Sequence, residues 1–220
     1  MEIARAESER GELVLRRRDD DALELRANGV FVMDTVETSS ERALATEALA
    51  RHRAPATVLV GGLGLGFTLA AVLADERVRR VVVVEIEPAL VQWLRDGTVA
   101  HGPALLADER VEVVVGDVAQ VIGTAGEAAY DLVLLDVDNG PGYLVHDGNA
   151  ALYGADLLVA ARRVLRSRGL CVIWSAAHDD ALDHALREVF GHAEAAAYDV
   201  DLQGRAEQYW LHLAWVRSRA

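Results

Sequence analysis

The chain has 220 residues, of which 52% are hydrophobic and 26% charged, which is typical of one globular α/β domain with a small appendage. Its formal net charge of −13 at pH 7 disfavours nucleic-acid partners, because binding to a phosphate backbone requires basic patches. The sequence contains no lysine, which excludes Schiff-base catalysis and a lysine-bearing phosphate loop.

No apolar run approaches the roughly 20 residues that span a bilayer, so we expect no transmembrane segment and no membrane partner. Residues 1–7 are charged and lack the apolar region of a signal peptide. We therefore expect a cytoplasmic protein.

The N-terminal residues predict a small antiparallel β unit. Apolar and polar residues alternate over residues 13–16 and again over residues 23–26. Asn28-Gly29 then separates the second run from residues 30–33, as the tight turn of a β-hairpin does.

A helix is expected next. Thr38-Ser39-Ser40-Glu41 has the spacing of a capping box, in which Thr38 caps the helix and Glu41 reaches back to the backbone. The helical pattern continues to about His52. We place a boundary here, with a hairpin and linking helix in residues 1–54 and a nucleotide-binding domain in residues 55–220.

The rest of the chain alternates short Val/Leu/Ile runs with alanine-rich helical stretches, which predicts a parallel sheet covered by helices on both faces. The sequence ends in two more predicted strands joined by a turn at Gln203-Gly204. We expect an α/β fold with a Rossmann-like, seven-stranded sheet of the methyltransferase type. The predicted strands are residues 58–60, 81–84, 111–115, 132–135, 170–174, 193–200 and 209–216, with helices near 67–75, 88–96, 118–123, 150–166 and 179–190.

A glycine loop follows the first of these strands and predicts a nucleotide site. Gly62, Gly64 and Gly66 allow backbone N–H groups to approach a ligand at the carboxyl end of the sheet. Glu85 ends the next strand, where a carboxylate accepts hydrogen bonds from ribose hydroxyls. Phe67 stands where a dinucleotide fingerprint requires glycine, which favours an adenosyl sulfonium over NAD.

Acidic residues follow the third and fourth strands. Asp117 is placed either to accept from an adenine amino group or to cap the next helix, and both interpretations stay open. Asp136 and Asp138 are candidates to hold a cationic amine and take up its proton, with an Asx-type turn as the alternative. They supply carboxylates at only one strand end, so we predict no metal site.

Two further features have two possible interpretations each. Tyr143, His146 and Asp147 lie on the segment after Asp136, which forms either a lid or a surface loop without a catalytic role. Trp174 at the end of the fifth strand forms either a wall of an acceptor pocket or part of the core.

From about Asn28 to Trp174 the chain resembles the spermidine synthase (polyamine aminopropyltransferase) family. The resemblance implies a methyltransferase fold, a homodimer, and transfer of an aminopropyl group from decarboxylated S-adenosylmethionine to an amine such as putrescine. It also implies that Glu85 holds the ribose, Asp117 the adenine, and that Asp136 assists deprotonation of the amine. The family-like motifs are Val58-Leu59-Val60-Gly61-Gly62, Val84-Glu85-Ile86-Glu87, Val115-Gly116-Asp117 and Leu135-Asp136.

The chain departs from the family pattern in the aminopropyl half of the site. Leu65 replaces the loop aspartate that holds the donor's aminopropyl ammonium, Met33 replaces a glutamine of the hairpin, and the second acid of the catalytic loop is lost or moved to Asp138. Two alternatives therefore remain, methyl transfer from S-adenosylmethionine itself and a non-catalytic dimerisation module. From Leu65 we expect weak discrimination between the two donors, and we expect Leu65→Asp to favour the decarboxylated one.

Overall fold

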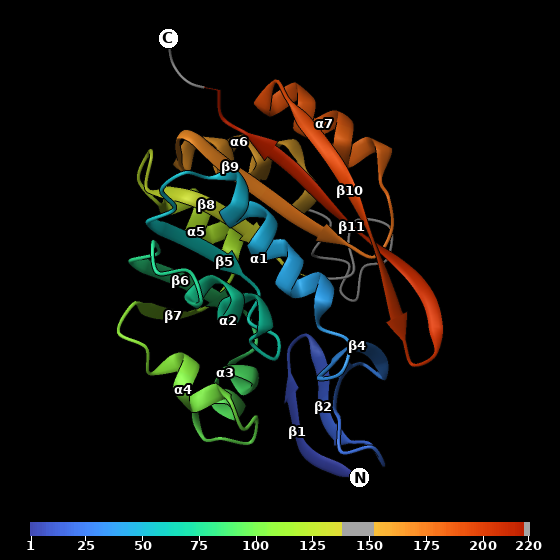
Figure 1. The fold of residues 1–220 in the computed structure, drawn as a ribbon. Coiled ribbons are helices and arrows are strands. Elements are labelled where there is room, and N and C mark those ends of the chain that lie inside the picture. Colours follow the sequence, from blue (N-terminus) through green and yellow to red (C-terminus); the bar gives the residue numbers. More distant parts are fainter. Residues whose placement is uncertain (138–151, 218–220) are drawn as a thin grey trace.

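The computed structural model describes residues 1–137 and 152–217, which form two β-sheets and the helices that pack on them (Figure 1). The predicted N-terminal β unit is present as a four-stranded antiparallel sheet in the order β1-β2-β3-β4. Its strands are β1 (Glu2–Ser8), β2 (Gly11–Arg17), β3 (Leu23–Ala27) and β4 (Val30–Asp34).

Strand β1 was not expected from the sequence. Its residues are mostly charged or small, and the strand lies at the edge of the sheet, so none of them is fully buried. Without a buried face, an edge strand carries little alternation of apolar and polar residues. The turn at Asn28-Gly29 was predicted correctly, and both residues have a positive φ there, of 51° and 78°.

The second sheet has seven strands in the order β10-β11-β9-β8-β5-β6-β7, which confirms the predicted sheet type. The pairs from β9 to β7 are parallel, whereas β11 is antiparallel to both of its neighbours. The strands are β5 (Thr57–Gly61), β6 (Arg80–Glu85), β7 (Val111–Val115), β8 (Tyr130–Leu135), β9 (Leu165–Ser175), β10 (Ala193–Leu202) and β11 (Arg205–Trp215).

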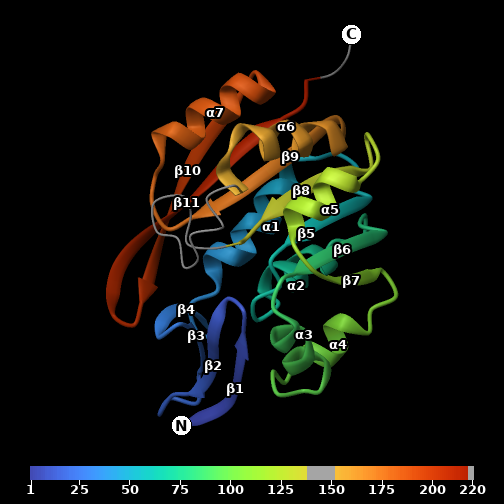
Figure 2. The same ribbon diagram turned by 180° about the vertical axis from the view of Figure 1, so that it is seen from behind.

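Helices cover both faces of this sheet (Figures 1 and 2). Residues of α1, α2 and α3 share one buried apolar cluster with one face, and residues of α5, α6 and α7 share another cluster with the opposite face. The helices are α1 (Ser39–Arg51), α2 (Phe67–Leu73), α3 (Pro88–Arg95), α4 (Gly102–Leu106), α5 (Val118–Thr124), α6 (Ala155–Val164) and α7 (Asp180–Phe190).

Alternation along the central strands produces these two clusters. Val58 and Val60 of β5 pack on the side of α1 and α2, whereas Leu59 between them packs on the side of α5 and α6. Side chains of successive strand residues point to opposite faces, so a strand buried on both sides is apolar throughout. Burial of both faces of these strands explains the uninterrupted Val/Leu/Ile runs in the sequence.

The predicted capping box at the start of α1 is wrong. Thr38 occupies the N-cap position, but its side chain makes no capping hydrogen bond and its hydroxyl oxygen instead accepts from Arg42 Nε at 3.1 Å. Glu37 accepts from the backbone N–H of Ser39 at 2.8 Å. The Glu41 carboxylate instead accepts from the Ser40 hydroxyl at 2.9 Å.

The predicted division into residues 1–54 and 55–220 stays a prediction. Helix α1 of the first segment packs against α2 of the second. None of the helices in residues 1–137 and 152–217 has the length and apolar character needed to cross a membrane.

Candidate functional site

A cleft of about 260 Å³ lies between the carboxyl ends of the parallel strands and the N-terminal sheet. Gly62, Gly64, Glu85, Asp117 and Asp136, five of the residues that the sequence singled out, line it together. They follow β5, β6, β7 and β8, and the carboxyl ends of neighbouring parallel strands meet at one edge of a sheet. We call this cavity the donor cleft.

The glycine loop brings its backbone close to the strand β8. Gly62 has a φ of +91°, and a Cβ atom added to it would lie 1.9 Å from the carbonyl oxygen of Asp136. Gly64 has a φ of +51° and faces the sulfur of Met33, which would lie 2.8 Å from an added Cβ. Gly66 is the N-cap of α2 and packs near Leu94 instead of lining the donor cleft.

Replacing Gly62 by alanine should destabilise the fold strongly. The left-handed φ and the clash with a backbone oxygen act together, and we expect a loss of about 2–4 kcal/mol in the free energy of unfolding. Urea unfolding followed by circular dichroism measures it. Gly123→Ala in α5 is the matched control, because an added Cβ meets nothing within 4 Å there. Equal midpoints for the two variants would contradict the assigned loop conformation.

Glu85 is buried, with 4% of its surface exposed, and it fastens the glycine loop. Its Oε2 accepts from the backbone N–H of Leu63 at 2.8 Å, and its Oε1 accepts from the backbone N–H of Glu87 at 2.8 Å. Burial raises the pKa of Glu85, and these N–H groups oppose that shift. Each carboxylate oxygen has a second lone pair, so the group can hold the loop and a ribose hydroxyl together.

Asp117 acts as a helix cap, which is one of the two interpretations of its sequence position. Its Oδ1 accepts from the backbone N–H of Ala119 at 2.8 Å and so caps α5. The residue also lines the donor cleft, so the cap does not remove it from reach of a ligand.

Asp136 follows β8 and is partly buried beside the glycine loop. Its Oδ2 accepts from the hydroxyl of Thr68 at 2.9 Å. Burial raises the pKa of Asp136 to about 6, the hydrogen bond from Thr68 opposes the shift, and the negative charge of Glu85 adds to it. A carboxyl group with such a pKa changes its protonation state near neutral pH, as proton transfer at that pH requires.

Leu65 does not have the position that the sequence analysis gave it. Its side chain is fully buried in the core, so the expectation that it presents an apolar surface to a donor is wrong. The backbone of Leu65 is anchored by Met33, whose sulfur lies 3.3 Å from its nitrogen, and by His101, whose Nε2 lies 2.7 Å from its oxygen. Leu65→Asp would place a charge in the core and is unsuitable as a test of donor preference.

A second cavity, of about 320 Å³, lies beside Val32, which also lines the donor cleft. Glu37 and Glu41 reach it from the segment before α1 and from α1, and Glu207 reaches it from β11. We call it the acidic cleft. Sequence reasoning missed it, because residues more than 160 positions apart form it and the chain carries no local motif for it.

Aromatic side chains line the acidic cleft. Trp174 lines it and packs edge-on against Tyr209, with 4.8 Å between the ring centroids. Trp174 is also 7% exposed and belongs to the core cluster, which confirms the core interpretation, whereas its role in an acceptor pocket stays a prediction. Burial raises the pKa of Tyr209 to about 12, and the negative charges of Glu41 and Glu207 add to the shift.

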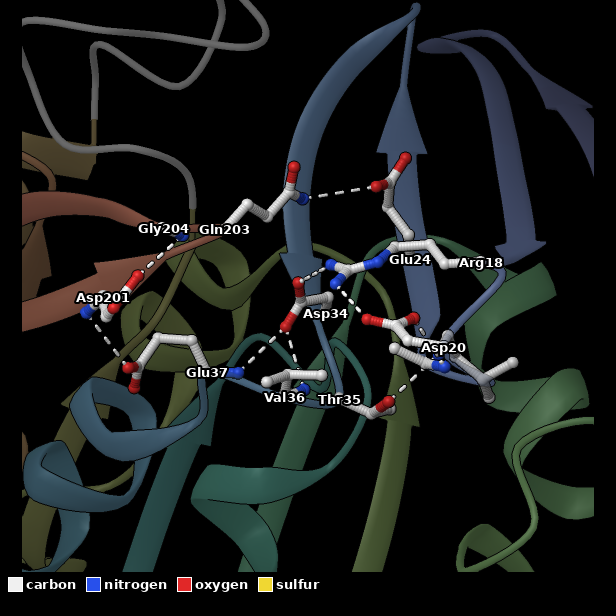
Figure 3. Close-up of polar contacts among 12 residues, drawn as sticks. Arg18, Asp20, Glu24, Asp34, Thr35, Val36, Glu37, Asp201, Gln203 and Gly204 are labelled. Carbon is white, nitrogen blue, oxygen red and sulfur yellow. Dashed lines mark hydrogen bonds and ion pairs between the residues drawn. The ribbon is translucent and has the colours of Figure 1, made fainter.

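The tip of the β10–β11 hairpin lies beside the N-terminal sheet (Figure 3), and Leu202 of this hairpin lines the acidic cleft. Gln203 Nε2 donates to Glu24 at 3.4 Å, and the backbone N–H of Asp201 donates to Glu37 at 3.4 Å. Asp34 forms an ion pair with Arg18, with 2.6 Å between Oδ2 and Nη1. Figure 3 also shows that Asp34 fixes the backbone just before α1, through the N–H groups of residues 36 and 37.

Four of the sequence-predicted residues, Asp138, Tyr143, His146 and Asp147, lie outside the described residues. Thr68 and Glu41 are site residues that the sequence analysis missed or assigned to another role. Threonine in an apolar helix start carries no signal of its own, and Glu41 matched a capping pattern. Within the described ranges, His, Cys, Asp and Glu side chains do not gather in threes as metal ligands would.

The family model described as "Spermine/spermidine synthase domain" matches residues 37–182 of the chain. Polyamine aminopropyltransferase 2 of Pseudomonas aeruginosa is 30% identical over 158 residues, which are 67% of this chain and 43% of that protein. Polyamine aminopropyltransferase of Aeropyrum pernix is 30% identical over 132 residues, which are 56% of this chain and 42% of that protein. The chain thus spans about half the length of the curated relatives it matches.

Solved structures show the same fold. A spermidine synthase in complex with the transition state analogue AdoDATO superposes with a TM-score of 0.83 at 17% identity, covering 97% of this chain and 73% of that one. Spermidine synthase from Thermotoga maritima gives a TM-score of 0.81 at 18% identity, with 97% and 72% of the two chains covered.

Proposed function

The chain belongs to the spermine/spermidine synthase family, and from that premise we propose that it transfers an aminopropyl group from decarboxylated S-adenosylmethionine to a small amine such as putrescine. The donor binds in the donor cleft, where Glu85 accepts from the ribose hydroxyls and Asp117 from the adenine amino group. Gly62 and Gly64 let the loop backbone approach the nucleoside.

The acidic lining of the donor cleft is the observation that carries the choice of donor. Among the residues that the structure describes, five acidic residues and one basic residue line it, and the basic one, Arg10, lies 3.7 Å from the carboxylate of Glu87. Decarboxylated S-adenosylmethionine has a sulfonium and an ammonium, whereas S-adenosylmethionine adds a carboxylate that such a cleft repels. The acidic residues are Glu12, Glu85, Glu87, Asp117 and Asp136. This replaces the expectation of weak discrimination that rested on Leu65.

Asp136 performs the proton transfer. Its carboxylate holds the attacking amine beside the sulfonium and accepts a proton from it, which frees the nitrogen lone pair. The nitrogen bonds to the methylene carbon next to sulfur, and the carbon–sulfur bond breaks with its electron pair going to sulfur. The products are a neutral thioether nucleoside, 5′-methylthioadenosine, and the aminopropylated amine.

Donor preference tests this function by binding alone. We expect decarboxylated S-adenosylmethionine to bind at least tenfold more tightly than S-adenosylmethionine, a difference of about 1.4 kcal/mol, because in the described lining the one cation, Arg10, is already beside the carboxylate of Glu87. Isothermal titration calorimetry with both nucleotides at fixed salt measures it. Tighter binding of S-adenosylmethionine would favour methyl transfer instead, and binding of neither would favour a non-catalytic module.

Assembly and location stay predictions of the same proposal. A homodimer is expected from the family, and light scattering of the purified chain tests it. Fractionation of cells that express the protein tests the expected cytoplasmic location.

A further inference from the structure

Thr68 links a residue of the donor cleft to the backbone of a residue of the acidic cleft. The Thr68 hydroxyl is 2.9 Å from Asp136 Oδ2 and 3.2 Å from the backbone oxygen of Glu41, so it ties the start of α1 to the end of β8. Asp136 lines the donor cleft and Glu41 lines the acidic cleft. Val32 belongs to both linings, so the two cavities adjoin at this residue.

Of the three acidic residues that line the acidic cleft, Glu41 is the one that is available to a ligand where this cleft adjoins the donor cleft. Glu37 is occupied, because it accepts from the backbone N–H groups of Ser39 and Asp201 and holds the β10–β11 hairpin in place (Figure 3). Glu207 is exposed on β11, at the outer side of the cavity. Glu41 is partly buried, and its carboxylate accepts from the Ser40 hydroxyl alone among the side chains described.

The surroundings of Glu41 fit a cationic alkyl chain. The rings of Trp174 and Tyr209 and the side chain of Val32 offer apolar walls for methylene groups. The indole N–H of Trp174 is buried without a hydrogen-bond partner among the described residues. Buried polar groups are ordinarily paired, so an unpaired one in a cavity wall points to a partner that is supplied by a ligand.

Resting on the aminopropyl transfer proposed above, we propose that Glu41 binds the reacting ammonium of the acceptor from the acidic cleft and sets the enzyme's affinity for that acceptor. The ammonium donates one N–H to Glu41 and another to Asp136. Asp136 takes its proton, the freed nitrogen attacks the donor carbon, and sulfur leaves with the electron pair of the broken bond. Glu41 stays ionised throughout and holds the positive charge that develops on nitrogen.

If Glu41 binds the acceptor, acceptor binding should depend on pH through the protonation state of its carboxyl group. Burial raises the pKa of Glu41 to about 7, and the negative charge of Asp136 adds to the shift. An ammonium is bound by the carboxylate form, so acceptor binding is full above this pKa and is lost as the pH falls below it. In Glu41→Gln the dependence near pH 7 disappears, and only the dependence near pH 6 that belongs to Asp136 remains.

The test measures binding to the whole chain without turnover. The protein is first saturated with 5′-methylthioadenosine, and 1,4-diaminobutane is then titrated by calorimetry into wild type, Glu41→Gln and Glu47→Gln. Glu47 lies on the same helix and pairs with Arg51 away from both cavities, so Glu47→Gln is the matched control. We expect Glu41→Gln to weaken diamine binding at least tenfold and to leave nucleoside binding unchanged, while Glu47→Gln changes neither.

A thermal melt at pH 8 shows that Glu41→Gln is folded. A carboxyl group whose pKa is raised on folding lowers stability above that pKa, so removal of its charge should not lower the melting temperature. Diamine binding equal to wild type in Glu41→Gln would overturn the role of Glu41. A wild type that binds the nucleoside and no diamine would overturn the acceptor site, and one that binds neither would overturn the proposed function itself.

Discussion

Asp136→Asn should lower kcat for aminopropyl transfer by about 10²–10⁴, with donor binding within twofold of wild type. The amide is isosteric with the carboxyl group and still accepts the hydrogen bond from Thr68, but it cannot take a proton from the amine. Removal of general-base assistance typically costs this much in rate. The loss lies in kcat and in kcat/KM together, because the proton moves only in the transition state.

Steady-state kinetics with a saturating donor and several diamines measure this effect. In wild type, kcat/KM for the amine should also fall as the pH decreases through about 7 and then about 6, because Glu41 must be ionised to bind the amine and Asp136 must be ionised to accept its proton. Near-normal turnover of Asp136→Asn with every accepted amine would make Asp136 a turn residue only, which was the alternative interpretation of its sequence.

Glu85→Gln should weaken donor binding by roughly 10- to 100-fold, or about 1.5–3 kcal/mol, the usual value of one charge-assisted hydrogen bond. Glutamine keeps one oxygen as an acceptor, but its amide nitrogen faces a backbone N–H that Glu85 now satisfies, at either Leu63 or Glu87. The substitution therefore removes a ribose contact and loosens the loop that positions the nucleoside. Glu85→Ala would do both more severely.

Calorimetric titration with the decarboxylated donor measures this loss. Glu112→Gln on the neighbouring strand β7 is the matched control, since Glu112 is an exposed partner of Arg80 and lies outside the donor cleft. A Glu85→Gln variant that binds the donor within twofold of wild type would remove Glu85 from the nucleotide site.

The fold was predictable because strands that are buried on both faces have a recognisable amino-acid composition. Strands covered on both faces need consecutive apolar residues at their buried positions, and β5, β6 and β8 each contain an uninterrupted run of Val or Leu. β1, an edge strand with alternating charge, and α4, a helix of 5 residues, lack a pattern of this kind and were missed. The capping pattern at Thr38 failed because Glu37 satisfied the helix N-terminus instead.

The glycine loop and the carboxyl groups of the donor cleft were predictable because each of these residues follows a strand end along the chain. Gly62, Glu85 and Asp136 are placed by the parallel sheet itself. The acidic cleft was not, since Glu41, Trp174 and Glu207 meet only when α1, β9 and β11 pack together. The burial of Leu65 was also hidden, because a sequence position in a loop does not reveal which side of the backbone faces the ligand.

Product analysis tests the central claim most directly. The protein is incubated with decarboxylated S-adenosylmethionine and 1,4-diaminobutane, and the products are separated and identified by mass spectrometry. The account predicts 5′-methylthioadenosine and the aminopropylated diamine in equal amounts, with neither formed by Asp136→Asn above background. Formation of a methylated amine from S-adenosylmethionine, with no 5′-methylthioadenosine from the decarboxylated donor, would contradict it.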